Sequence, residues 1–115
     1  MAQIVKSLIF KGGESGDLIL LLVSGANQAD LELTSATVGE PLVRADASEV
    51  RARTGFAIGG VSPIGHLEAP RIWMDETLLN YPMVWAAAGA PDAVFEISPE
   101  ALRAATGATV AGLTA

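Results

Sequence analysis

A glycine-rich segment is the feature of this sequence with the clearest chemical potential. Gly55, Gly59, Gly60 and Gly65 lie close together, with Pro63 among them. Glycine lets the backbone approach a ligand closely, and proline holds one point of the loop in place. Backbone N–H groups of such a loop can bind an anion or stabilise a developing oxyanion. The spacing fits neither a dinucleotide-binding fingerprint nor a Walker loop, so an ordinary glycine-rich turn is the alternative interpretation.

Four titratable side chains could act together with this segment. Lys6 shares a strand face with apolar residues, an uncommon place for lysine. It could be a cation on a pocket wall, or a side chain whose ammonium group reaches water from the strand end. His66 is the only histidine and ends the loop. It could contact substrate or transfer a proton, or be a structural imidazole. Asp75 and Glu76 together are typical of a helix start.

Composition excludes several kinds of site. The chain of 115 residues has no cysteine and one histidine, which excludes thiolate chemistry and histidine-rich metal centres. We therefore expect no metal and no cofactor. The net charge of −6 argues against a general nucleic-acid binder, so any contact with nucleic acid must be local. The longest apolar run, residues 18–23, is too short to cross a membrane, and no signal peptide is evident. We expect a cytoplasmic protein that makes no membrane contact.

The elements that must position these residues follow from hydrophobic periodicity and from capping signals. Strands are expected over residues 4–10, 18–23, 42–45, 71–74, 83–88 and 94–97. Helices are expected after Asp30 to about residue 38, after Asp46 to residue 54 and after Ser98, and they end at Gly39, Gly55 and Gly107, respectively. A turn or short helix is expected from Asp75 to residue 79. Asp46 and Glu49 resemble a capping box. Trp73 and Trp85 lie in strand patterns, which favours a core position over base stacking. Residues 56–66 are expected to be loop.

This order of elements predicts one domain, residues 1–115, of the mixed α/β (α+β) class. Half of the residues are hydrophobic, which is enough for a small core made mainly of aliphatic side chains. The short strands alternate irregularly with short helices, so a strongly curved sheet is expected.

The sequence resembles the YbaK/prolyl-tRNA-synthetase-associated editing domain family. The most specific similarity is the segment TGFAIGGVSPIGH, residues 54–66. Supporting similarities, in the same order along the chain, are residues 5–8, 45–50, 74–79, 88–89 and 98–102. This resemblance implies a curved, barrel-like mixed sheet with flanking helices. It also implies hydrolysis of the ester that joins a wrong amino acid to its tRNA.

The resemblance assigns roles to individual residues. The lysine of the family maps onto Lys6, and its G-x-x-x-P loop maps onto residues 59–63. A histidine of the alanine-editing branch maps onto His66. The expected catalytic residues are therefore Lys6, Gly59 and His66. The expected substrate-binding residues are the following: Gly60, Val61, Ser62, Pro63 and Asp75. Lys6 would hold the terminal adenosine, His66 would contact the α-amino group, and water would be the nucleophile.

Two hypotheses of function follow. The first is a trans-editing deacylase that removes a small amino acid from mischarged tRNA, in particular a tRNA for proline, with an aminoacyl-tRNA synthetase as a further partner. The second is a non-catalytic module that binds an aminoacyl group, an adenosine or a synthetase. Family members carry a helical segment before the lysine strand, and here Lys6 lies close to the N-terminus. We therefore expect an open pocket and a homodimer that covers it.

Overall fold

The protein was examined as a computed structural model, which describes residues 3–57, 61–88 and 93–114. Its centre is a five-stranded sheet of order β3-β1-β2-β4-β7. The strands are the following: β1 (Val5–Gly12), β2 (Leu18–Ser24), β3 (Leu42–Arg44), β4 (Arg71–Asp75) and β7 (Thr109–Ala111). β1 is antiparallel to β2 and β3, whereas β2, β4 and β7 run parallel. The sheet is therefore mixed, as the sequence predicts.

β2 lies in the middle of this sheet, and all seven of its residues are buried. An apolar run of this kind predicts a strand that is covered on both faces, and the structure confirms it. Alternate residues of β2 belong to two hydrophobic clusters. The first cluster contains Leu18, Leu20 and Leu22, and the second contains Ile19, Leu21 and Val23. The sheet consequently has a core on each side.

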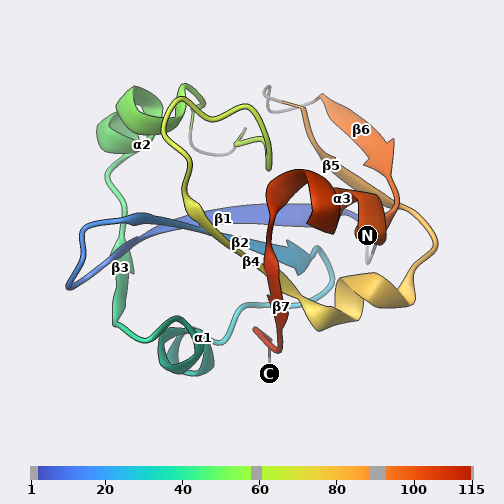
Figure 1. Cartoon of the computed structure of the whole chain (residues 1–115), viewed down its shortest axis with the longest axis horizontal. Helices are drawn as coiled ribbons and strands as arrows, with labels where there is room; N and C mark the ends of the chain where they lie inside the picture. The colour runs from blue at the N-terminus through green and yellow to red at the C-terminus, as the bar shows by residue number, and fades with distance from the viewer. Residues whose placement is uncertain (1–2, 58–60, 89–92, 115) are drawn as a thin grey trace.

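Different elements cover the two faces of the sheet (Figure 1). The first face is covered by α2 (Ala47–Thr54), the 3-10 helix η1 (Glu76–Asn80), α3 (Pro99–Thr106) and a hairpin of β5 (Val84–Ala87) and β6 (Val94–Ile97). The second face is covered by α1 (Leu31–Val38) and the C-terminal segment. β5 also forms a parallel bridge to the start of β1, between Trp85 and Ile4. The hairpin is otherwise a separate two-stranded sheet, and the five-stranded sheet is not closed into a barrel.

Local sequence signals account for the helix ends. The side chains of Asp30 and Ser98 accept hydrogen bonds from backbone N–H groups of the first turns of α1 and α3. Asp46 stands at the N-cap of α2, but its side chain makes no capping hydrogen bond there. It accepts from Ser48 Oγ instead, while Glu49 pairs with basic side chains. The capping box expected from Asp46 and Glu49 is therefore wrong, although the helix begins where it was predicted.

Ten of the eleven elements agree with the expected ones to within two residues at each end. The exception is β7, whose segment is rich in small residues and gives no strand signal. It pairs in parallel with β4, from Trp73 opposite Thr109 to Asp75 opposite Ala111. Among the described residues, no helix is long and apolar enough to cross a membrane.

Candidate active site

A cavity of about 280 Å³ opens at the edge of β1 that faces away from β2. β1 pairs with β3 through residues 10–12 and contacts β5 at Ile4, so the cavity lies between these two contacts. We call it the edge cavity. Its lining comes from the first half of β1, from the loop and from the β5–β6 hairpin: Ile4, Val5, Lys6, Ser7, Leu8, Val61, Ala87, Ala93 and Val94. This is where the predicted lysine and the predicted loop meet.

Lys6 is half-buried on β1, opposite Val23 of β2. Its side chain is on the second face of the sheet, because the alternating neighbours Leu8 and Phe10 pack into the second cluster. Lys6 Nζ donates a hydrogen bond to the backbone oxygen of Asn27. An ammonium group has three donors, so this bond holds the group in place while leaving capacity for a ligand.

A chain of hydrogen bonds connects Lys6 to Asp75. Asn27 Nδ2 donates to Thr77 Oγ1 at 3.4 Å, and Thr77 Oγ1 donates to Asp75 Oδ2. Asp75 is only 1% exposed, and its Oδ1 accepts from the backbone N–H of Leu113 at 2.8 Å. The carboxylate thus supports the segment that holds Lys6. The sequence predicted Asp75 as a substrate contact, but the structure places it beneath the surface.

Ser7 is a residue of the edge cavity that the sequence analysis did not single out. It follows Lys6 directly, so its side chain lies on the opposite face of β1, toward the first cluster. Its Oγ is buried and has no hydrogen-bond partner among the described residues. A buried hydroxyl without a partner costs free energy, which makes this group a candidate ligand contact. The signal in the sequence was a hydroxyl at a core-facing strand position, next to the lysine.

Three loop residues predicted as substrate-binding are buried, namely Val61, Ser62 and Pro63. Val61 is 2% exposed, packs into the first cluster and lines the edge cavity. Gly59 and Gly60 lie outside the described residues. The loop therefore brings at least Val61 to the same cavity as Lys6 and Ser7.

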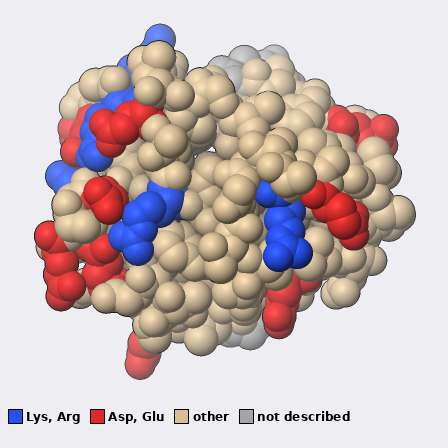
Figure 2. Space-filling view, viewed as in Figure 1, with Lys and Arg blue, Asp and Glu red and all other residues tan. Residues whose placement is uncertain are grey.

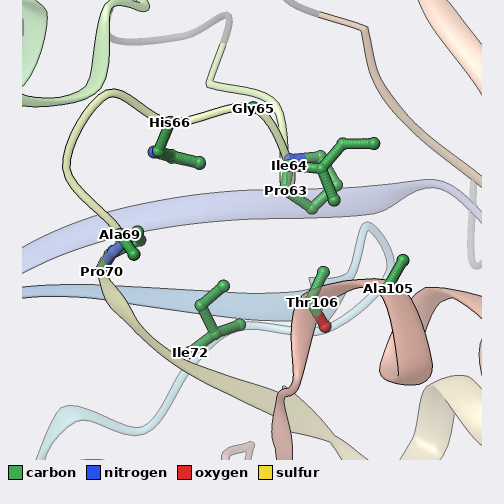
Figure 3. Close-up of a pocket in the computed structure, with 9 residues that line it drawn as sticks. All are labelled: Pro63, Ile64, Gly65, His66, Ala69, Pro70, Ile72, Ala105 and Thr106. Carbon is green, nitrogen blue, oxygen red and sulfur yellow. The ribbon is translucent and has the colours of Figure 1, made fainter.

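A second cavity, of about 220 Å³, lies on the other side of the loop. Figure 3 shows its lining, which comes from the loop, from the start of β4 and from the end of α3: Pro63, Ile64, Gly65, His66, Ala69, Pro70, Ile72, Ala105 and Thr106. We call it the loop cavity. His66 lines this cavity, and the edge cavity is lined by Lys6, so the structure does not bring the two predicted catalytic side chains together.

His66 is held by the loop itself. Its Nε2 lies 2.6 Å from the backbone oxygen of Ser62, and its ring meets that of Phe56 edge-on at 5.2 Å. Because a carbonyl oxygen can only accept, Nε2 carries a proton in this arrangement. Burial lowers the pKa of His66, and the bond to Ser62 opposes that effect in part. The buried Nδ1 has no partner among the described residues.

The edge cavity is a better candidate for the active site than the loop cavity. The edge cavity combines a cation, a buried hydroxyl without a described partner, and a loop residue next to the glycine pair. The loop cavity offers the neutral ring of His66 and the hydroxyl-bearing Thr106 in a mainly apolar lining. Among the described residues there is no cluster of three or more side chains that could hold a metal ion.

Comparison with known proteins gives a consistent result. A sequence model of the aminoacyl-tRNA editing domain matches residues 1–105. One crystal structure, described as that of "a putative trans-editing enzyme for prolyl tRNA synthetase", is 53% identical in sequence with a TM-score of 0.94. That match covers 99% of this chain and 71% of the other.

Two other relatives are less similar in sequence. Uncharacterized protein YwhH of Bacillus subtilis (strain 168) is 31% identical over 102 residues, which are 89% of this chain and 64% of YwhH. The "Putative Cys-tRNA(Pro)/Cys-tRNA(Cys) deacylase EbsC" of Enterococcus faecalis (strain ATCC 700802 / V583) is 26% identical over 113 residues, or 97% of this chain and 68% of EbsC. The chain thus spans about two thirds of the length of these relatives.

Proposed function

Because the chain belongs to the aminoacyl-tRNA editing domain family, we propose that it is a trans-editing hydrolase that removes a small amino acid from mischarged tRNA. The observation that carries the proposal is the family match, which extends over residues 1–105. A tRNA for proline is the expected substrate, since the similar crystal structure is described in connection with prolyl-tRNA synthetase. A synthetase would be a transient partner, and the cytoplasm would be the place of action.

The edge cavity can accommodate the reacting end of such a substrate. Its volume of about 280 Å³ is close to the lower end of the range for small-molecule sites, roughly 300–1,000 Å³. The lining is mostly apolar and suits a small aliphatic side chain such as that of alanine. Lys6 would bind a phosphate or hydroxyl of the terminal adenosine, and Ser7 would hydrogen-bond the aminoacyl group.

The chemistry is the hydrolysis of an ester. Water adds to the carbonyl carbon, and the negative charge of the tetrahedral intermediate develops on the carbonyl oxygen. Backbone N–H groups of the loop, beginning with that of Val61, would stabilise this charge. The bond from the carbonyl carbon to the ribose oxygen then breaks, and the ribose hydroxyl regains a proton that the water has lost. The neighbouring ribose hydroxyl of the tRNA would assist the attacking water.

Surface charge requires that the contact with tRNA be local. The net charge is −6, and the face in Figure 2 shows acidic and basic side chains dispersed over a mainly uncharged surface. Proteins that bind nucleic acid through its backbone normally present a continuous basic patch. We therefore propose that the protein recognises mainly the aminoacylated end of the tRNA, so that a synthetase or the amino acid itself provides further selectivity.

Deacylation of a panel of mischarged tRNAs by the purified protein tests this function. We expect the rate on alanyl-tRNA for proline to exceed the spontaneous rate clearly, with much lower rates on the matched prolyl-tRNA. Binding of these tRNAs without turnover would support the non-catalytic module instead. Absence of both binding and turnover would contradict both hypotheses.

Substitution of Lys6 tests the site. Lys6→Ala should remove most of the activity, because it deletes the cation of the edge cavity. The unfolding free energy should fall by only about 1–3 kcal/mol, the range for a hydrogen bond to a charged group. The matched control is Lys11→Ala on the same strand, whose ammonium group pairs with Glu49 outside the cavity. Full activity of Lys6→Ala, or equal losses in both variants, would exclude Lys6 from the site.

A further inference from the structure

Trp85 is an exposed aromatic side chain on a fixed piece of backbone. It lies within β5 and is 39% exposed, and its backbone N–H donates to the backbone oxygen of Gln3 at 2.9 Å. The other tryptophan, Trp73, packs against the second cluster, with the Arg71 guanidinium 5.2 Å from its ring. The two tryptophans thus differ in environment, although both lie in strand patterns. The expected core position is confirmed for Trp73 and is wrong for Trp85.

The register of the β5–β6 hairpin places Trp85 beside the edge cavity. Ala87 and Val94 are directly opposite each other and both line the cavity. Trp85 is two residues from Ala87, so the two side chains lie on the same face of the strand, about 7 Å apart along it. Ile4, which forms the bridge to Trp85, lines the cavity as well. Trp85 does not itself line the cavity, but it lies directly beside two residues that do.

The residues around this ring form an exposed apolar surface. Ile4 is 37% exposed, Val94 is 53% exposed and Met83 is 36% exposed. Single exposed apolar residues need no explanation, but a contiguous group at the mouth of a cavity indicates a binding surface. Planar aromatic rings in such places commonly stack on nucleobases, because every base has a flat π face.

We propose that Trp85 is the stacking platform for the terminal adenine of the aminoacylated tRNA. This inference rests on the proposed function, since that function places the ester carbonyl in the edge cavity. A ribose separates the carbonyl from the base, so the base must lie about one sugar away from the reacting atom. Trp85 stands at that separation from the cavity lining, on the same face of the hairpin as Ala87.

Glu96 gives this platform a preference among bases. It is directly opposite Trp85 in the hairpin, where side chains of neighbouring strands are about 5 Å apart at Cβ. A carboxylate at the edge of the stacked base accepts from an exocyclic amine, which adenine, cytosine and guanine carry and uracil lacks. The larger ring of adenine gives more overlap with indole than cytosine does. The carboxylate also disfavours phosphate at this point, so the backbone of the tRNA must leave on the Lys6 side.

Fluorescence provides the test, because the chain has only two tryptophans. In a Trp73→Phe background the emission comes from Trp85 alone. We expect the trinucleotide CCA and adenosine monophosphate to quench this emission, and uridine monophosphate to do so less effectively. Glu96→Gln should reduce the difference between the two monophosphates. Absence of quenching by CCA at millimolar concentration would overturn the proposal.

Kinetics on the whole substrate provide the second test. Trp85→Ala should raise KM by about tenfold or more, while Trp85→Phe retains a ring and should change it less. The effect should fall on KM with little change of kcat, as expected when binding of a remote group is lost. The matched control is Leu67→Ala, an exposed apolar residue outside both cavities. Unchanged KM in a folded Trp85→Ala variant would overturn the stacking role of Trp85 but not the proposed deacylase activity. Quenching by CCA without turnover of any aminoacyl-tRNA would contradict the deacylase activity but not the stacking role.

Discussion

At the scale of single residues, removal of the Ser7 hydroxyl should affect catalytic activity and not the stability of the fold. A buried hydroxyl without a partner is a cost to the folded state, so Ser7→Ala should leave the unfolding free energy unchanged or raise it slightly. The same substitution should lower kcat/KM for deacylation by about tenfold, while Ser7→Thr retains part of the activity. Urea denaturation and steady-state kinetics measure the two effects. A less stable variant with normal kcat/KM would show that Ser7 is structural.

His66 makes a prediction about pH. Burial lowers its pKa below the ordinary 6.5, so the folded protein binds this proton less tightly than the unfolded chain does. Stability that depends on the neutral ring is therefore complete above about pH 6.5 and is lost as the pH falls through the lowered pKa. Glu40, Glu49 and Glu68 also have lowered pKa values, but their effect lies below about pH 4.5.

The measurement is urea denaturation of wild type and His66→Gln at pH 7 and pH 5. The wild type should lose more stability between these values than the variant does. An equal loss would show that the ring titrates normally. Since protonation would put a charge on the ring at the buried Nδ1, which has no described partner, we also expect it to disturb the loop and to reduce deacylation in the same pH range.

At the scale of elements, the loop of residues 56–66 depends on the backbone of Gly65. Gly65 has φ +82° and Gly39, at the end of α1, has φ +94°. An added Cβ would make only an ordinary contact with Phe56 at Gly65 and none within 4 Å at Gly39. Alanine at either position should therefore cost about 1–2 kcal/mol, the strain of the left-handed backbone alone.

This similarity makes the two glycines a matched pair. Gly65→Ala should reduce deacylation several-fold, because the loop that carries Val61 relaxes away from the edge cavity. Gly39→Ala should leave kcat/KM near the wild-type value at equal loss of stability. Thermal denaturation and kinetics of both variants test this, and equal kcat/KM in the two would show that the loop geometry does not matter for activity.

At the scale of the whole molecule, Asp75 joins the sheet to the C-terminal segment. Its carboxylate binds Leu113 N at 2.8 Å and accepts from Thr77 and Thr114. The same segment accepts from Asp30 N through the Leu113 carbonyl, so one buried group connects β4, α1 and the C-terminal segment. Asp75→Ala should lower the unfolding free energy by about 3 kcal/mol, because it leaves buried donors without partners.

The control for Asp75 is Asp17→Ala, whose exposed carboxylate lies 3.6 Å from Arg71 and should cost less than about 1 kcal/mol. Activity per folded molecule should be close to wild type in Asp17→Ala and reduced in part in Asp75→Ala, because Asp75 supports the segment that holds Lys6. A stable but inactive Asp75→Ala would favour the substrate-binding role that the sequence predicts.

The association state is also a property of the whole molecule. Light scattering at high concentration tests the expected homodimer.

The sequence by itself determined the elements, because their signals are local. The caps at Asp30 and Ser98, the glycines that end the helices and the apolar run of β2 each act over a few residues, and each is observed where it was expected. The family resemblance rested on one contiguous segment for the same reason. β7 escaped prediction because its strand character comes from pairing with β4, far away in the sequence, and not from its own small residues.

Only the tertiary structure decided which candidates meet. Alternation along β1 predicts that the side chains of Lys6 and Ser7 lie on opposite faces of the strand. It does not predict that both residues line one cavity at an unpaired edge of β1. His66 follows the loop closely in sequence, yet the turn at Gly65 directs it to a different cavity. Trp85 and Trp73 have similar local patterns, and the layers packed against each strand partly bury Trp73 and leave Trp85 exposed. Periodicity specifies the face of a strand, and long-range packing alone specifies what covers that face.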